Sequence, residues 1–277
     1  MPALTPSVVP DDRLLPLTAA ETARYARHLA LPQVGEVGQR RIRAARVLVV
    51  GLGGLGSPVA LYLAAAGIGT LGLADADVVD ESNLQRQVVH ATADAGRPKV
   101  DSAADRLAAL NPRVRAVRHP QGLTRDNART IVDGYDVVID ATDTFDARYL
   151  VNDVCVELGT PWVHGAVGQL HGQVSVLAAV SDAGPGPCYR CLHPEPPSPD
   201  PGGDPGILGP LPGIVGAVQA AETLKLVVGG PTLVGRVLMV DAWTMRFDEV
   251  PLAKDPACPV CGAGSVPAAR GVRQRSG

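Results

Sequence analysis

Residues 47–74 read VLVVGLGGLGSPVALYLAAAGIGTLGLA, and this uncharged stretch decides the fold. It is long enough for a membrane span, but its glycines and Pro58 interrupt it in the wrong places for one. Val47–Val50 is a short apolar run typical of a strand that is buried on both faces. A glycine turn, a helix over Ser57–Ala66 and a second strand over Leu71–Ala74 follow it. We therefore expect a strand, a turn, a helix and a strand here, and no membrane helix.

The glycine turn GLGGLG predicts a nucleotide-binding site. Its glycines are Gly51, Gly53, Gly54 and Gly56. Bare backbone at these positions lets a phosphate approach the helix N-terminus, where unpaired N–H groups and the helix dipole favour an anion. Asp75 directly follows the second strand, where an acid can hydrogen-bond ribose hydroxyls. The alternative is a glycine turn that serves only the close packing of a helix on a sheet.

Polar side chains follow the second strand in the segment DADVVDESNLQRQVVH, residues 75–90, and in GRPKV, residues 96–100. The carboxyl ends of parallel strands are where ligands bind in open α/β sheets. Arg86 and Lys99 are placed to neutralise phosphate oxygens there. The candidate binding residues in this region are Asp75, Asp77, Asn83, Arg86, Gln87 and Lys99. A solvated polar loop is the alternative interpretation.

A further buried strand is predicted over Val137–Asp140, and it ends in DATDTFDARY. Asp143 in this segment is a candidate Mg²⁺ ligand, because magnesium on nucleotides usually takes one or two carboxylates. Strands and helices alternate up to Val167, which predicts a parallel sheet, and the pattern after Gly172 favours antiparallel strands. The predicted fold class is α/β: a Rossmann-like, doubly wound, mainly parallel sheet with an antiparallel C-terminal extension.

Four of the five cysteines form two CxxC pairs. CYRC contains Cys188 and Cys191, and CPVC contains Cys258 and Cys261. Two such pairs can supply four thiolates to one tetrahedral zinc ion. Two disulfides or a redox pair are the alternative, which the absence of a secretion signal disfavours. Four thiolates leave no open coordination position, so we expect a structural zinc.

Bulk composition limits the function classes. The 277 residues carry a net charge of −3, which gives no reason to expect nucleic acid or an anionic membrane as a partner. The N-terminus has no basic-then-apolar signal, so we expect a cytoplasmic protein. We divide the chain into a loose tail over residues 1–17, one domain over 18–262 and a disordered tail over 263–277.

Together, these segments resemble the ThiF/MoeB/HesA family, the bacterial relatives of ubiquitin-activating enzymes. The shared segments, in order, are RYARHLALPQVG, GLGGLG, DADVVDESNLQRQ, GRPK, the TD of ATDTFDARY, HGQVSV, CYRC, LPGIVGAVQAAETLK and CPVCG. They span roughly Thr18 to Gly262. The resemblance is strongest to the adenylyltransferases that activate sulfur-carrier proteins in molybdopterin or thiamin synthesis.

The resemblance implies ATP-dependent adenylation of the C-terminal glycine of a small ubiquitin-like carrier protein that ends in Gly-Gly. The roles that it implies are the ribose contact for Asp75, the phosphate contacts for Asn83, Arg86 and Lys99, and the magnesium ligand for Asp143. Arg27, which the residues alone would place on a solvated basic helix face, would reach the triphosphate bound by a partner subunit. A homodimer is therefore expected.

The chain departs from the family pattern at several positions. Thr144 stands where the family usually has Asn, and His28 and His171 stand where Gln and Glu are expected, with no role assigned to either. There is no cysteine between residues 192 and 257, where relatives carry one in a loop. We therefore expect adenylation without a covalent thioester or acyl-disulfide, and sulfur from a separate sulfurtransferase or persulfide donor, since no rhodanese domain follows. The Pro/Gly-rich loop 194–206 is a candidate gate for the carrier tail.

The sequence is also compatible with three other functions. The glycine turn and Asp75 alone would also suit an NAD-dependent oxidoreductase, although Arg86, Lys99 and Asp143 suit a triphosphate better. A different acceptor, such as a ribosomal peptide or a pathway-specific carrier, is compatible with the same family. A non-catalytic scaffold is the third alternative.

Overall fold

The computed structural model describes residues 4–178, 180–181, 184–196 and 206–262. Its α-helices are α1 (Ala19–Arg24), α2 (Ala26–Leu29), α3 (Gly35–Ala44), α4 (Gly56–Ala66), α5 (Lys99–Leu110), α6 (Ala128–Val132), α7 (Phe145–Leu158), α8 (Tyr189–Leu192) and α9 (Pro210–Val228). Its strands are β1 (Leu4–Thr5), β2 (Arg46–Val50), β3 (Thr70–Ala74), β4 (Arg115–His119), β5 (Val137–Asp140), β6 (Trp162–Gly168), β7 (His171–Leu177), β8 (Val180–Ser181), β9 (Gly184–Pro185), β10 (Gly230–Pro231), β11 (Arg236–Asp241) and β12 (Arg246–Pro251). Short 3₁₀ helices cover Asp11–Arg13, Glu81–Asn83 and Thr92–Asp94.

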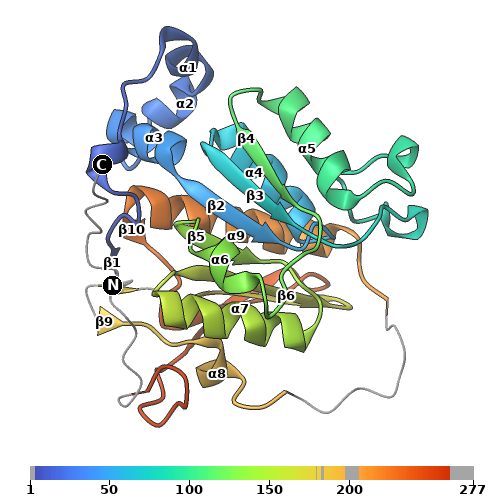
Figure 1. Cartoon of the computed structure of the whole chain (residues 1–277). Helices are drawn as coiled ribbons and strands as arrows, with labels where there is room; N and C mark the ends of the chain where they lie inside the picture. The colour runs from blue at the N-terminus through green and yellow to red at the C-terminus, as the bar shows by residue number, and fades with distance from the viewer. Residues whose placement is uncertain (1–3, 179, 182–183, 197–205, 263–277) are drawn as a thin grey trace.

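One eight-stranded sheet organises the chain, with the strand order β12-β11-β7-β6-β5-β2-β3-β4 (Figure 1). The five strands β4, β3, β2, β5 and β6 pair in parallel, and β7, β11 and β12 continue the sheet antiparallel. The direction changes where β6 turns back directly into β7 without a crossover helix. The predicted fold class, a mainly parallel sheet with an antiparallel C-terminal extension, is confirmed.

Helices cover both faces of the sheet. The larger apolar core lies between the sheet and α4, α5 and α9, and a second core lies against α6 and α7. In Figure 1, α7 lies in front of the sheet and α9 behind it. By length and composition α9 could cross a membrane, but 56% of its most apolar window is buried inside the structure. Since α9 packs on α4 and on β6, its apolar residues are explained by the core.

The segment before α1 lies against the domain, whereas we expected a loose tail over residues 1–17. β1 pairs with β10, the Ser7 hydroxyl donates to the Val227 carbonyl at 2.6 Å, and Val9 is only 3% exposed. This segment has no helical or strand periodicity in its sequence, but backbone pairing and the buried Val9 hold it in place. The predicted tail over 263–277 lies outside the described residues.

Candidate active site

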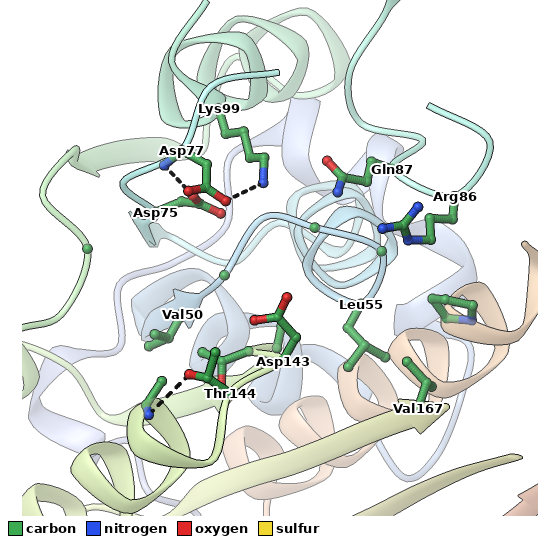
Figure 2. A pocket seen from close by; sticks show the side chains of 18 of the residues that line it. Val50, Leu55, Asp75, Asp77, Arg86, Gln87, Lys99, Asp143, Thr144 and Val167 are labelled. Atoms are coloured by element: carbon green, nitrogen blue, oxygen red, sulfur yellow. Dashed lines mark hydrogen bonds and ion pairs between the residues drawn. The ribbon is translucent and has the colours of Figure 1, made fainter. Parts of the chain in front are cut away.

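A cavity of about 690 Å³ opens at the carboxyl ends of β2, β3 and β5 (Figure 2). Its walls come from the glycine turn, the segment after β3, the start of α5, the loop after β4, the turn before α7, the end of β6 and the segment that leads into α9. The sequence-predicted residues that line it are Gly51, Gly53, Gly54, Asp75, Asp77, Arg86, Gln87, Lys99 and Asp143. The structure therefore gathers these separate segments around one space, at the edge of the sheet where ligands bind in this class of fold.

The glycine turn is shaped by close backbone contacts. Gly51 has φ +89°, and a side chain there would begin 2.6 Å from the Ala141 carbonyl oxygen. Gly56 does not line the cavity; a Cβ there would lie 1.9 Å from the Gly51 carbonyl oxygen, so this glycine lets α4 begin against the turn. The Leu52 N–H donates to the Asp75 carboxylate at 2.7 Å. As a result, the N-terminus of α4 meets the cavity, in the geometry that favours a bound anion.

Lys99 supplies a buried cation to the cavity. It is the first residue of α5, and only 6% of it is exposed. Its Nζ lies 2.9 Å from the carboxylate of Asp77, which is itself exposed. A buried ammonium with an exposed carboxylate beside it can attract further negative charge, because the low local dielectric strengthens such interactions.

Arg86 and Gln87 lie on the same side of the cavity as Lys99, as Figure 2 shows. The Arg86 guanidinium donates to the Asn83 side-chain oxygen at 2.7 Å. Asn83 does not line the cavity, so it orients Arg86 from behind. Gln87 is 4% exposed, and its Oε1 has no hydrogen-bond partner among the described residues. Arg86 and Gln87 thus offer a second positive charge and an available acceptor.

Asp143 lies across the cavity from Lys99 (Figure 2). Its carboxylate forms no hydrogen bond or ion pair with any of the described residues. An exposed carboxylate beside a phosphate-binding wall suits Mg²⁺, which binds proteins through one or two carboxylates and keeps water and phosphate as its other ligands. Asp143 would hold this ion.

Two of the residues that depart from the family pattern, Thr144 and His28, have defined structural contacts. Thr144 caps α7, since its hydroxyl accepts the Ala147 N–H at 3.4 Å. His28 Nδ1 lies 2.9 Å from Gln39 Oε1 and joins α2 to α3. His171 is exposed at the start of β7 and does not line the cavity. Neither histidine therefore belongs to this site within one chain.

Arg27 lies at the other end of the domain. Tyr25 separates α1 from α2, and its hydroxyl accepts a hydrogen bond from Asn111 Nδ2 at 2.9 Å. Asn111 caps the end of α5, whereas the start of α5 lines the cavity. The twelve residues of α5 separate these two ends by about 18 Å. Arg27 on α2 is thus outside the cavity of its own chain.

The four predicted cysteine ligands form a compact cluster. Their Sγ atoms all lie within 4.8 Å of one another, and Cys188 and Cys258 are 3.6 Å apart at sulfur. A disulfide needs about 2.0 Å, whereas four thiolates around one zinc ion lie about 3.8 Å apart. Burial raises the pKa of the Cys261 thiol to about 11, so a nearby cation would be needed to keep this thiol ionised at neutral pH. The cluster fits the predicted zinc site with four thiolate ligands.

Comparison with known proteins agrees with this geometry. The model of the ThiF family matches residues 25–260. The chain belongs to the ThiF family. It is 49% identical over 258 residues to the SAMP-activating enzyme E1 of Haloferax volcanii, covering 91% of this chain and 93% of that protein. It is 49% identical over 252 residues to the sulfur carrier protein adenylyltransferase of Thermus thermophilus, covering 88% and 92%.

Solved structures support the fold of this ThiF-family domain. The crystal structure of MccB from E. coli superposes with a TM-score of 0.75, covering 93% of this chain and 76% of that chain. At 19% sequence identity, this likeness concerns the fold alone.

Two buried residues behind Asp143 were not assigned by the sequence analysis. Asp140 ends β5 and His164 lies in β6, and both are fully buried. The sequence does indicate Asp140, because it is a charged residue at the end of an apolar strand. Its histidine partner is not apparent from the sequence, because the pairing depends on the register of β5 and β6 in this ThiF-family sheet.

We predict that Cys191→Ser removes zinc from the ThiF-family domain and lowers its melting temperature. If zinc contributes about 5 kcal/mol, less than half of what it gives to zinc-finger peptides, its loss lowers Tm by roughly 10–20 °C. Metal analysis and thermal denaturation measure both effects. Cys155→Ala, which changes the buried cysteine outside the cluster, should keep its zinc. Full zinc content in Cys191→Ser would contradict the assignment.

Proposed function

We propose that this chain uses ATP to adenylate the C-terminal glycine of a ubiquitin-like sulfur-carrier protein. The observation that carries the proposal is the arrangement of Lys99 and Arg86 across a nucleotide-sized cavity from Asp143. This set suits a magnesium triphosphate better than a dinucleotide. The high identity to a sulfur carrier protein adenylyltransferase supports a carrier as the acceptor, ahead of a peptide.

In the proposed reaction, a carboxylate oxygen of the carrier attacks the α-phosphorus of ATP. A new acyl–phosphate bond forms, the bond between the α-phosphorus and the oxygen that bridges it to the β-phosphate breaks, and pyrophosphate leaves. Asp75 holds the ribose, while Lys99, Arg86 and the α4 N-terminus neutralise the phosphates. A magnesium ion on Asp143 would neutralise further charge on the phosphates. The protein's contribution is therefore orientation and charge stabilisation, without a covalent intermediate.

The test is ATP–pyrophosphate exchange with and without a purified carrier protein that ends in Gly-Gly. We expect carrier-dependent exchange, because the adenylation step is reversible and needs no sulfur donor. ATP binding without exchange for several carriers would contradict the proposal and favour a peptide acceptor or a scaffold. Binding of NAD in preference to ATP–Mg²⁺ would favour the oxidoreductase alternative; thermal shift detects either ligand by mass action.

We further infer that sulfur comes from a separate protein. Four of the five cysteines lie in the metal cluster, and Cys155 is fully buried. No cysteine is thus placed to form a thioester with the carrier. Mass spectrometry of the reaction should find no DTT-reversible carrier adduct on a cysteine of this chain. A thiolate cluster of this kind also suits the cytoplasmic location that we expect.

The carrier needs a surface beside the cavity mouth, and the tip of the β11–β12 hairpin offers one. Trp243, Met245 and Phe247 at this tip are 73%, 61% and 47% exposed. The Ala242 N–H, next to the tip, donates to the Leu170 carbonyl at 2.9 Å, two residues after the cavity-lining Gly168 at the end of β6. Clustered exposed apolar residues mark interaction sites. We infer that the folded part of the carrier rests on the hairpin tip while its tail enters past Gly168.

We predict that Trp243→Asp raises the KM for the carrier by about 30-fold, the effect of an interface tryptophan worth about 2 kcal/mol. The affinity for ATP should not change, because Trp243 does not line the cavity. Exchange kinetics at varied carrier concentration measure this effect. Val180→Asp is the matched control, since Val180 is 59% exposed on the short β8–β9 hairpin, beside β1. An unchanged carrier KM in Trp243→Asp would exclude the hairpin tip as the docking surface.

The predicted gate over residues 194–206 stays a prediction, because residues 197–205 lie outside the described part of the chain. Shortening this loop should weaken carrier use while sparing ATP binding.

We also infer that the active form is a homodimer. Arg27 lies outside its own cavity, so it can serve the triphosphate only from a partner subunit.

A further inference from the structure

A buried carboxylate lies directly behind the turn that carries Asp143. Asp140, the last residue of β5, is fully buried. Its Oδ1 accepts the backbone N–H of Thr142 at 3.0 Å and the Thr142 hydroxyl at 2.7 Å. Both bonds attach the turn to the end of a central strand.

His164 holds this carboxylate from the neighbouring strand β6. Its Nδ1 lies 2.9 Å from Asp140 Oδ2, and the Gln173 amide nitrogen lies 3.2 Å from its Nε2. Because the amide nitrogen donates to Nε2, the proton of a neutral imidazole sits on Nδ1 and is donated to Asp140. Burial lowers the pKa of His164, which keeps the ring in this neutral form.

Thr142 is also held from the other side. Arg148 on α7 is 7% exposed, and its Nη2 donates to the Thr142 carbonyl at 3.0 Å. The N–H, hydroxyl and carbonyl of Thr142 are therefore all bonded to buried groups. The next residue, Asp143, is exposed and reaches into the cavity (Figure 2).

The Asp143 carboxylate forms no hydrogen bond or ion pair with the described residues, so no other side chain sets its direction. Its direction is set through the backbone beside it, at Thr142. A functional group needs to be held within about 0.5 Å of its working position, and a 1 Å error can cost about 100-fold in rate.

We propose that Asp140 and His164 are positioning residues, which fix Thr142 so that the Asp143 carboxylate is held ready for magnesium. The inference rests on the proposed role of Asp143 in ATP–Mg²⁺ binding. It adds two buried residues that touch neither nucleotide nor carrier. Their effect passes through one backbone step, from Thr142 to Asp143.

The first test compares Thr142→Val with Thr142→Ser. Valine has the shape of threonine but loses the hydroxyl that Asp140 accepts, whereas serine keeps it. We expect Thr142→Val to need about tenfold more Mg²⁺ than wild type for half-maximal ATP affinity, measured by calorimetry at varied Mg²⁺. Thr142→Ser should stay near wild type. ATP binding without any divalent cation should be equal in all three proteins.

The second test compares His164→Leu with His164→Asn. Asparagine places an amide nitrogen near the position of Nδ1 and can still donate to Asp140, whereas leucine cannot. We expect His164→Leu to need more Mg²⁺ than wild type for half-maximal ATP affinity, as Thr142→Val does. His164→Asn should stay near wild type. If His164→Leu does not fold, the Thr142 pair decides alone.

Equal Mg²⁺ dependence of folded Thr142→Val and Thr142→Ser would overturn the inference, because a purely structural role predicts lower stability with no change in metal response. These measurements need no carrier. Failure of carrier-dependent exchange would therefore count against the proposed function and not against this positioning role.

Discussion

Lys99→Met should reduce ATP–pyrophosphate exchange by about 10²–10³-fold, the effect of removing one group that stabilises transition-state charge. The side chain is almost completely buried at the cavity wall, and the carboxylate beside it, Asp77, is exposed to solvent. Its charge is therefore available to the phosphates, and the low dielectric around it makes that charge effective. Methionine keeps the length and apolar contacts of the side chain and removes only the charge.

The matched control is Lys254→Met. Lys254 is half-buried and does not line the cavity, so the same substitution there should leave exchange near the wild-type rate. Thermal denaturation of both variants separates a chemical effect from unfolding. A folded Lys99→Met protein with near-normal exchange would mean that the phosphates are held elsewhere. If the variant has a normal kcat and a raised KM for ATP, Lys99 stabilises bound ATP equally in the ground state and in the transition state.

The position of Lys99 could be predicted because the governing rule is local and topological. The glycine turn and Asp75 each follow the end of a strand that the apolar pattern identifies, and Lys99 begins the next long helix. In a parallel sheet such ends meet at one edge. The four cysteines were predictable for a similar reason, since two CxxC pairs have few stable arrangements other than one metal site.

The buried pair of Asp140 and His164 could not be predicted in this way. The two residues are direct partners in the register of β5 and β6, and the sequence does not specify that register. Tyr25, which separates α1 from α2, also has a partner far away in the sequence, Asn111. The residues before α1 have no periodic pattern, and backbone pairing of β1 with β10 holds them against the domain. In each case, the contacts join residues that are far apart in the sequence.

The second large effect concerns Arg27. Arg27→Ala should reduce exchange by about 10²–10³-fold if its guanidinium stabilises the triphosphate in the transition state. Arg24→Ala is the matched control, because Arg24 lies three residues earlier, at the end of α1, and already donates to the Leu110 carbonyl of its own chain. It should keep normal exchange. Equal losses in both variants would point to a general effect on this end of the domain.

A heterodimer decides whether Arg27 acts across the subunit interface. We would coexpress an Arg27→Ala chain and a Lys99→Met chain with different tags, and purify dimers that carry both. If Arg27 serves the partner's cavity, the Arg27→Ala chain supplies an intact cavity and the other chain supplies the arginine. One of the two sites is then complete, and exchange returns to about half of the wild-type rate.

If Arg27 acted within its own chain, both sites of this heterodimer would lack one essential charge, and exchange would stay as low as in the single variants. The location of α2 at the far end of α5 makes this second outcome difficult to reconcile with one folded domain. Recovery to half the wild-type rate would therefore establish that each cavity is completed by two chains. It would also explain why a basic residue outside the cavity is needed at all.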